Sequence, residues 1–120
     1  MIPFRIEVEA EDPGRAATVV RMAGRLNAAS SPEAKARLKG LAGGGAKHLL
    51  VDLSELSFID SSGLSALVAG YKAAVEAGGN LKLACLDPQV REVFALTHLD
   101  RVFETYPDMA AALASFPPGN

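Results

Sequence analysis

A nearly continuous aliphatic run, a polar turn and a helix that begins on serine and glycine follow one another between residues 48 and 79. The run at 48–53 is typical of a strand that is covered on both faces, as in a largely parallel sheet. Residues 58–64 then read Phe-Ile-Asp-Ser-Ser-Gly-Leu, which places two hydroxyls and a carboxylate at a predicted helix N-terminus. Backbone N–H groups point outward at such an end and favour negative charge. The rest of the chain must supply the layers that bury this strand and this helix.

The helix predicted at 62–77 carries two stripes of side chains with helical spacing. We expect an apolar stripe to face the sheet. Its members are Leu64, Leu67, Val68, Tyr71 and Val75. A second stripe consists of small residues, which let another backbone approach closely. Its members are Gly63, Ala66, Gly70, Ala73 or Ala74, and Ala77. Close packing inside the domain is the favoured interpretation of this second stripe, and a partner surface is the alternative.

Periodicity and turn residues predict the remaining elements. The first two strands form a predicted hairpin with a turn at 11–14, and Gly24 ends the second strand. The alternation of strands and helices that follows implies right-handed parallel crossovers. We therefore predict an α/β domain over residues 1–116 with a mixed, mostly parallel sheet of four to five strands, packed helices and a flexible tail at 117–120. The predicted strands are 4–10, 17–23, 48–53, 81–86 and an edge strand within 99–104, and the helices begin near residues 31, 62, 88 and 108.

Two of the helix starts carry recognisable capping residues. For the first helix, Ser31 fits an N-cap before Pro32, whereas Ser30 would instead form a capping box with Glu33. The third helix is capped by Asp87, which precedes a proline. The predicted buried side of this third helix holds Val90, Val93, Phe94 and Leu96.

Composition limits the classes of function. A chain of 120 residues of which 49% are hydrophobic suits one packed domain. The net charge of −2 predicts no nucleic-acid partner. No polybasic patch, no leader-like apolar segment and no apolar run of about 20 residues is evident, so we expect a cytoplasmic protein without a membrane partner. The cluster Lys35, Arg37 and Lys39 is interpreted as a solvated helix face. Cys85 is the single cysteine, and we expect a buried structural thiol within a strand.

A catalytic role for Ser61 lacks two requirements. A nucleophile elbow needs glycine two residues before the serine, and Ile59 stands there. A serine nucleophile also needs a base, but His48 begins the strand at the opposite end, roughly 20 Å away, and no third group is evident to orient His98. The two histidines and the scattered carboxylates show no metal-ligand spacing. Asp52 and Asp60 could mimic an acidic metal site at strand ends, but Asp52 is predicted within a strand and Asp60 at or beside the helix cap. We therefore predict no enzyme activity, no metal site and no cofactor.

Two other interpretations suit the same junction. Asp60, Ser61 or Ser62 can accept a hydrogen bond from the first helical turn, which is worth about 1 kcal/mol against alanine. A phosphoryl group on Ser61 would gain from the same N–H donors and from the helix dipole. Such a group would be accommodated without unfolding the helix, and its charge would oppose the binding of a partner there.

Three segments, in the same order, resemble the STAS family, and within it the single-domain anti-sigma factor antagonists of bacteria. Residues 51–64 are similar to the family's phosphorylation signature. Two further segments agree with the family: residues 24–27, Gly-Arg-Leu-Asn, after the second predicted strand, and residues 96–103 near the end of the chain. The likeness covers almost the whole chain, and the α/β architecture above is the one that it implies.

The resemblance implies a phosphorylation switch. In the family the serine directly after the aspartate of the motif is phosphorylated, and here that residue is Ser61. The kinase is the partner itself, an anti-sigma factor with a histidine-kinase-like ATPase fold, and a serine phosphatase resets the switch. The unphosphorylated antagonist binds this partner and frees the sigma factor. The implied contact surface comprises Asp60, Ser62, Gly63 and Leu64 with Gly24, Arg25 and Asn27 of the first strand-to-helix loop.

One position departs from the family pattern. Many members carry aspartate where this chain has Asn27, which keeps the shape and the hydrogen bonds but removes the charge. Ser62 is a second candidate phosphate acceptor. The alternative function is a STAS interaction module in another assembly, a sensor scaffold or a lipid-transport accessory, in which Ser61 is never modified. A nucleotide-binding role rests only on the anion-friendly helix start and lacks a phosphate loop.

Overall fold

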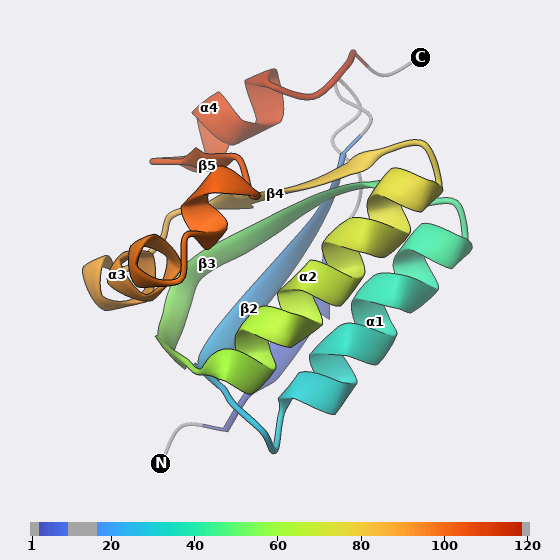
Figure 1. The fold of residues 1–120 in the computed structure, drawn as a ribbon. Helices are drawn as coiled ribbons and strands as arrows, with labels where there is room; N and C mark the ends of the chain where they lie inside the picture. The colour runs from blue at the N-terminus through green and yellow to red at the C-terminus, as the bar shows by residue number, and fades with distance from the viewer. Residues whose placement is uncertain (1–2, 10–16, 119–120) are drawn as a thin grey trace.

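A five-stranded sheet forms the centre of the computed structural model, which describes residues 3–9 and 17–118 (Figure 1). The strands follow one another across the sheet in the order of the sequence. The first pair is antiparallel and the other pairs are parallel, which confirms the predicted mixed sheet with an N-terminal hairpin. The strands are β1 (Arg5–Val8), β2 (Thr18–Leu26), β3 (His48–Ile59), β4 (Asn80–Ala84) and β5 (Thr105–Tyr106).

Helices cover both faces of this sheet. Two long helices, α1 and α2, lie side by side over one face, and the short α4 lies near the other (Figure 1). The segment that contains α3 and the 3-10 helix η1 packs at the end of the sheet beside α2. The helical elements are α1 (Ser31–Gly43), α2 (Ser61–Glu76), α3 (Pro88–Leu96), η1 (Leu99–Arg101) and α4 (Met109–Ala114).

The small residues of α2 pack against α1. A Cβ on Gly70 would lie 2.7 Å from Cδ1 of Leu38, so only glycine lets the two helices approach this closely. Ala66 and Ala74 of the same stripe are also buried. Close packing inside the domain is therefore confirmed for these positions. The apolar stripe was predicted correctly at Leu64 and Leu67 but wrongly at Val75, which is 47% exposed because Ala74, and not Val75, lies on the buried side of the last turn of α2.

Strand β2 does not end at Gly24, as predicted, but continues to Leu26. The glycine has a φ of +93°, and a Cβ there would lie 2.9 Å from the carbonyl oxygen of Pro3. The pairing of β2 with β3 shifts register beside this residue. The extra residue at this irregularity is Ser57 of β3, so Gly24 is an interior strand residue that lies beside a bulge of the neighbouring strand. Strand β3 likewise runs to Ile59 instead of ending at residue 53.

Neither predicted cap of α1 forms. Ser30 is the N-cap, but its hydroxyl donates to the carbonyl oxygen of Arg25 (2.7 Å) and accepts from the N–H of Asn27 (2.9 Å). The serine therefore ties the preceding loop together instead of capping the helix. The cap of α3 is confirmed, since Asp87 accepts from the N–H of Gln89.

Several local predictions were wrong in detail. Cys85 lies beyond β4 with a φ of +62° and is only partly buried, so the prediction of a buried strand thiol was wrong. Leu96 ends α3 at 73% exposure, while Val90 and Phe94 are buried as expected. The edge strand lies at 105–106, because the 3-10 helix occupies the start of the segment predicted for it. The predicted turn at 11–14 lies outside the described residues.

Candidate functional site

The junction of β3 and α2 is organised by one carboxylate. Asp60 is the N-cap of α2, and its Oδ1 accepts a hydrogen bond from the N–H of Gly63 (3.1 Å). Its backbone carbonyl accepts from the N–H of Leu64 (2.9 Å), which is the first intrahelical bond. Of the three residues that the sequence left open as caps, Asp60 alone takes the role. The hydroxyls of Ser61 and Ser62 are thereby left free of it.

The two serines lie in different surroundings. Ser61 is the first residue of α2 and is exposed. Ser62 is half-buried and lines a shallow groove of about 400 Å³ between the first turns of α1 and α2, together with Ser31 and Lys35. Within residues 3–9 and 17–118, neither hydroxyl forms a hydrogen bond. Ser61 is therefore the serine whose oxygen a second protein reaches most directly, and Lys35 lies at a groove beside the site.

Gly63 and Leu64 belong to the packing of the site. A Cβ on Gly63 would lie 2.5 Å from the carbonyl oxygen of Leu26 and 2.8 Å from Cγ1 of Ile59. Leu64 is 6% exposed and contributes to the core. These two residues hold the start of α2 against the ends of β2 and β3, so their part in any contact surface is to fix the position of Ser61.

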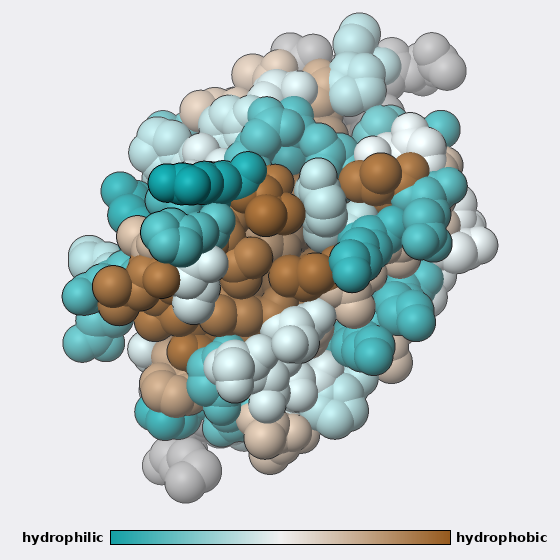
Figure 2. Space-filling view, viewed as in Figure 1, coloured by the Kyte–Doolittle hydropathy of each residue, from teal (hydrophilic) through white to brown (hydrophobic). Residues whose placement is uncertain are grey.

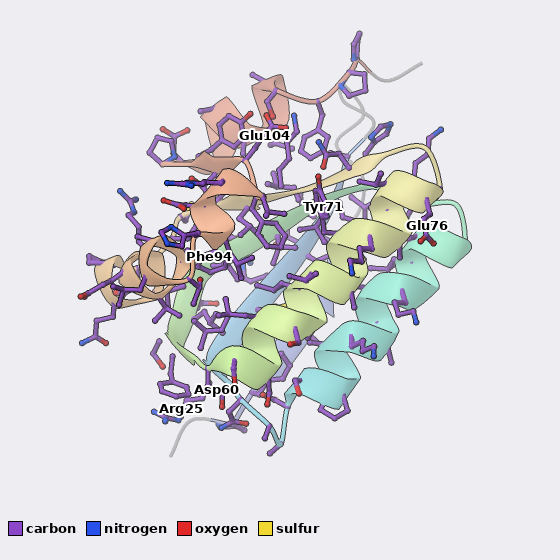
Figure 3. The ribbon with its side chains drawn as sticks, viewed as in Figure 1. Arg25, Asp60, Tyr71, Glu76, Phe94 and Glu104 are labelled. Carbon is purple, nitrogen blue, oxygen red and sulfur yellow. The ribbon has the colours of Figure 1, made fainter. Side chains whose placement is uncertain are left out.

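The loop from β2 to α1 lies beside this junction. The hydroxyl of Ser57 donates to the carbonyl oxygen of Gly24 (3.1 Å), and the guanidinium carbon of Arg25 lies 4.0 Å from the ring centroid of Phe58. Figure 3 shows Arg25 and Asp60 at the same end of the molecule. The structure thus brings Gly24 and Arg25 to the segment that carries Ser61. Phe58, as the aromatic partner of Arg25, was not recognised from the sequence, where it reads as one more apolar strand residue.

Asn27 shapes this loop through its side chain. Its Oδ1 accepts from the N–H of Ala29 (3.0 Å) and of Ser30 (3.3 Å), which is the geometry of an Asx turn. An aspartate oxygen would accept the same two bonds. The departure from the family pattern therefore changes the charge of the loop and leaves its hydrogen bonds intact.

An apolar groove adjoins the site along α2. Leu64, Val68 and Ala69 of α2 face Leu99 of η1 across it, with Ser65 and Lys72 at its rim. Figure 2 shows hydrophobic side chains gathered over this part of the surface, between α2 and the segment of α3 and η1. Nearby, Leu96 and Val102 are 73% and 42% exposed. The groove places an apolar contact surface within one helical turn of Ser61.

His48 lies away from Ser61, and Cys85 is unsuited to assist it. His48 begins β3, whose length puts it roughly 35 Å from the end of that strand, farther than expected from the shorter predicted strand. Burial, then Asp52 and Asp108, raise the pKa of Cys85, so its thiol stays protonated and is a poor nucleophile. In the described part of the chain, no group of three or more His, Cys, Asp or Glu side chains is placed to hold a metal ion. No helix among the described residues is long and apolar enough to cross a membrane.

Comparison with known proteins gives the family. The STAS domain model matches residues 7–112, and the chain belongs to this family. The anti-sigma-B factor antagonist of Bacillus subtilis is 33% identical over 85 residues, which are 71% of this chain and 77% of the relative. A crystal structure of an anti-sigma factor antagonist from Mycobacterium paratuberculosis is 26% identical, with a TM-score of 0.83 over 95% of this chain and 94% of that one.

A third similar protein is the Bacillus cell fate determinant SpoIIAA in its phosphorylated form. It shares 22% identity with this chain and has a TM-score of 0.70 over 92% of this chain and 97% of its own. That likeness shows the fold. The anti-sigma factor antagonists of the STAS family are regulatory binding proteins, as the sequence predicted, and they act in transcription through sigma factors.

Proposed function

We propose that this protein is an anti-sigma factor antagonist that binds a kinase-type anti-sigma factor while Ser61 is unphosphorylated and releases it once Ser61 carries phosphate. The observation that carries the proposal is the division of roles at the start of α2. Asp60 caps the helix, so the exposed hydroxyl of Ser61 is not needed for the cap and is free to be modified. Bound to its partner, the antagonist would leave the sigma factor free to act in the cytoplasm.

The chemistry of the switch belongs to the partner. Oγ of Ser61 attacks the γ-phosphorus of an ATP held by the anti-sigma factor, a new O–P bond forms, and the bond to the bridging oxygen of ADP breaks. The hydroxyl proton goes to a base of the partner, because His48 lies at the opposite end of β3. Phosphoryl transfer depends mainly on positioning and on charge stabilisation, so the antagonist has only to present the oxygen. A serine phosphatase would reverse the modification by hydrolysis.

The effect of phosphate follows from its neighbours. A phosphoserine carries up to two negative charges, and Ser61 directly follows the carboxylate of Asp60. Ser61 also lies about one helical turn from Leu64, which begins the apolar groove, so a partner seated in this groove would have to desolvate the phosphoryl group. A loss of about 3 kcal/mol weakens a complex roughly a hundredfold. SpoIIAA in its phosphorylated form has the same fold as this chain, which supports the view that this fold can carry phosphate.

Binding to a purified kinase-type anti-sigma factor tests the proposal. Ser61→Ala should bind as tightly as the unmodified protein and resist phosphorylation by the partner with ATP, whereas Ser61→Asp should bind at least tenfold more weakly. Ser54→Asp is the matched control, because Ser54 is exposed and lies roughly 20 Å up the strand from Asp60. Equal binding by Ser61→Ala and Ser61→Asp would instead favour a STAS interaction module without a serine switch.

A further inference from the structure

Arg25 holds its charge against an aromatic ring at the edge of the site. Its guanidinium carbon lies 4.0 Å from the ring centroid of Phe58, and the two residues are direct partners in the pairing of β2 with β3. Phe58 is half-buried, and Arg25 is exposed. Within residues 3–9 and 17–118, Arg25 forms no ion pair. A cation–π contact at an exposed position is weak, so this arginine is held in place but is not committed to a carboxylate.

The backbone places Arg25 within reach of Ser61. The carbonyl oxygen of Leu26 accepts a hydrogen bond from the N–H of Asp60 (3.2 Å), so Arg25 and Ser61 each lie one residue away from a direct contact between β2 and the helix start. Their Cα atoms are therefore no more than roughly 13 Å apart. Figure 3 shows Arg25 and Asp60 at the same end of the molecule. The loop from residue 24 to residue 32 contains this one cation, and Glu33 of α1 lines the same groove as Arg25.

We propose that Arg25 is an internal receptor for the phosphoryl group of Ser61, a role that rests on the proposed phosphorylation of this serine. After phosphorylation the guanidinium leaves the ring of Phe58 and pairs with the phosphoryl oxygens. A guanidinium and a phosphate form two parallel charge-assisted hydrogen bonds, which are stronger than an exposed cation–π contact. The N–H groups of the first turn of α2 serve the remaining oxygens.

This exchange gives the phosphorylated state a structure of its own. Arg25 offsets part of the repulsion between the phosphoryl group and Asp60. The same movement uncovers the ring of Phe58 and removes a positive charge from the surface beside it. The partner would therefore meet two changes at once, an added anion at Ser61 and a displaced cation at Arg25. The neutral side chain of Asn27 suits this role, because an aspartate there would compete for the guanidinium.

The test uses full-length protein in which phosphoserine is encoded genetically at position 61, so that no kinase is needed. A ³¹P NMR titration measures the second pKa of the phosphoryl group, which is ordinarily about 6. An adjacent guanidinium favours the dianion. Arg25→Gln should therefore raise this pKa by about half a unit or more relative to the protein with Arg25, and Arg25→Lys should have a smaller effect. Arg101→Gln, which removes an exposed arginine of η1, should leave it unchanged.

Two outcomes overturn the proposal. One is an equal second pKa with arginine and with glutamine at position 25, provided that the amide spectra show both proteins folded. The other is an equal rise in Arg25→Gln and Arg101→Gln, which would reflect net charge alone. Because phosphoserine is installed without a kinase, these results do not depend on whether an anti-sigma factor recognises Ser61. Failure of the proposed function would appear separately, as unchanged partner binding by Ser61→Asp.

Discussion

The carbonyl oxygen of Leu26 lies 2.5 Å from the position that a Cβ would take on Gly63. This contact joins the end of β2 to the first turn of α2, and it is reinforced by the hydrogen bond from the N–H of Asp60 to the same oxygen. The backbone oxygen cannot move aside as a flexible side chain can. The position of Ser61 is therefore set by a close approach of two backbones, which only glycine at position 63 permits.

Gly63→Ala should destabilise the protein by about 1–3 kcal/mol, the usual cost of forcing extra volume into a packed site. Urea unfolding measures this change. Gly40→Ala is the matched control, because Gly40 also lies in a helix but has no atom within 4 Å of an added Cβ. Replacing that exposed helical glycine should stabilise the protein by about 0.5–1 kcal/mol. Changes of the same sign in the two variants would contradict the role assigned to the contact with Leu26.

Asp60 combines a cap with a charge, and two substitutions separate these properties. Asp60→Ala removes the acceptor of the Gly63 N–H and should cost about 1 kcal/mol in the free energy of unfolding. Asp60→Asn keeps an oxygen acceptor and should stay within about 0.5 kcal/mol of the original protein. Hydrogen exchange of the first-turn amides of α2 should accelerate in the alanine variant and much less in the asparagine variant. Equal acceleration in both would mean that the negative charge, and not the hydrogen bond, stabilises the helix start.

Much of the fold follows from patterns that depend on neighbouring residues. The aliphatic run that begins β3 predicts a buried strand, and the small residues of α2 predict close packing against another element. Both predictions were confirmed. Element ends were less predictable, because they depend on distant contacts. Gly24 reads as a terminator in the sequence, but β2 continues past it, beside the backbone of Pro3 and a bulge in β3. Leu96 fits the apolar period of α3 yet lies on its last turn, beyond the core.

The site was partly visible in the sequence. The motif placed Asp60, Ser61 and Gly63 at a helix start, but the sequence left Asp60, Ser61 and Ser62 as equal candidates for the N-cap. The structure shows that the N–H of Gly63 donates to the carboxylate of Asp60. The stack of Arg25 on Phe58 joins residues 33 positions apart through strand register, which no local pattern reveals.

The burial of Lys82 was also missed. This lysine alternates with apolar residues as an exposed strand residue would, but its Nζ is buried and donates to the carbonyl and hydroxyl oxygens of Ser115.

His48 should make stability sensitive to mild acid. Burial, then the charges of Lys47 and Lys82, lower the pKa of its imidazole below the ordinary value near 6.5. Its Nδ1 is buried without a hydrogen bond within the described residues, and its ring meets the edge of Phe116. The unfolded state therefore binds the proton more readily, so stability is complete above about pH 7 and falls as pH drops through 6.5 towards the folded pKa.

Urea unfolding at pH 7.5 and pH 5.5 measures this dependence on His48. The loss of stability between the two values should be larger in the original protein than in His48→Gln, whose side chain does not titrate. His98→Gln is the control, because His98 is exposed at the start of η1. If His98→Gln reduced the loss as much as His48→Gln does, the assignment to His48 would be wrong.

Asn27 separates the shape of the loop from its charge. Asn27→Asp keeps the acceptor for the N–H groups of Ala29 and Ser30, so the free energy of unfolding should change by less than about 0.5 kcal/mol. Asn27→Ala loses both bonds and should cost about 1 kcal/mol. In the protein with phosphoserine at position 61, Asn27→Asp should raise the second pKa of the phosphoryl group, because a nearby negative charge disfavours the dianion. Asn27→Ala should leave that pKa closer to its original value. If aspartate and alanine raised it equally, loop geometry rather than charge would govern the electrostatics around Ser61.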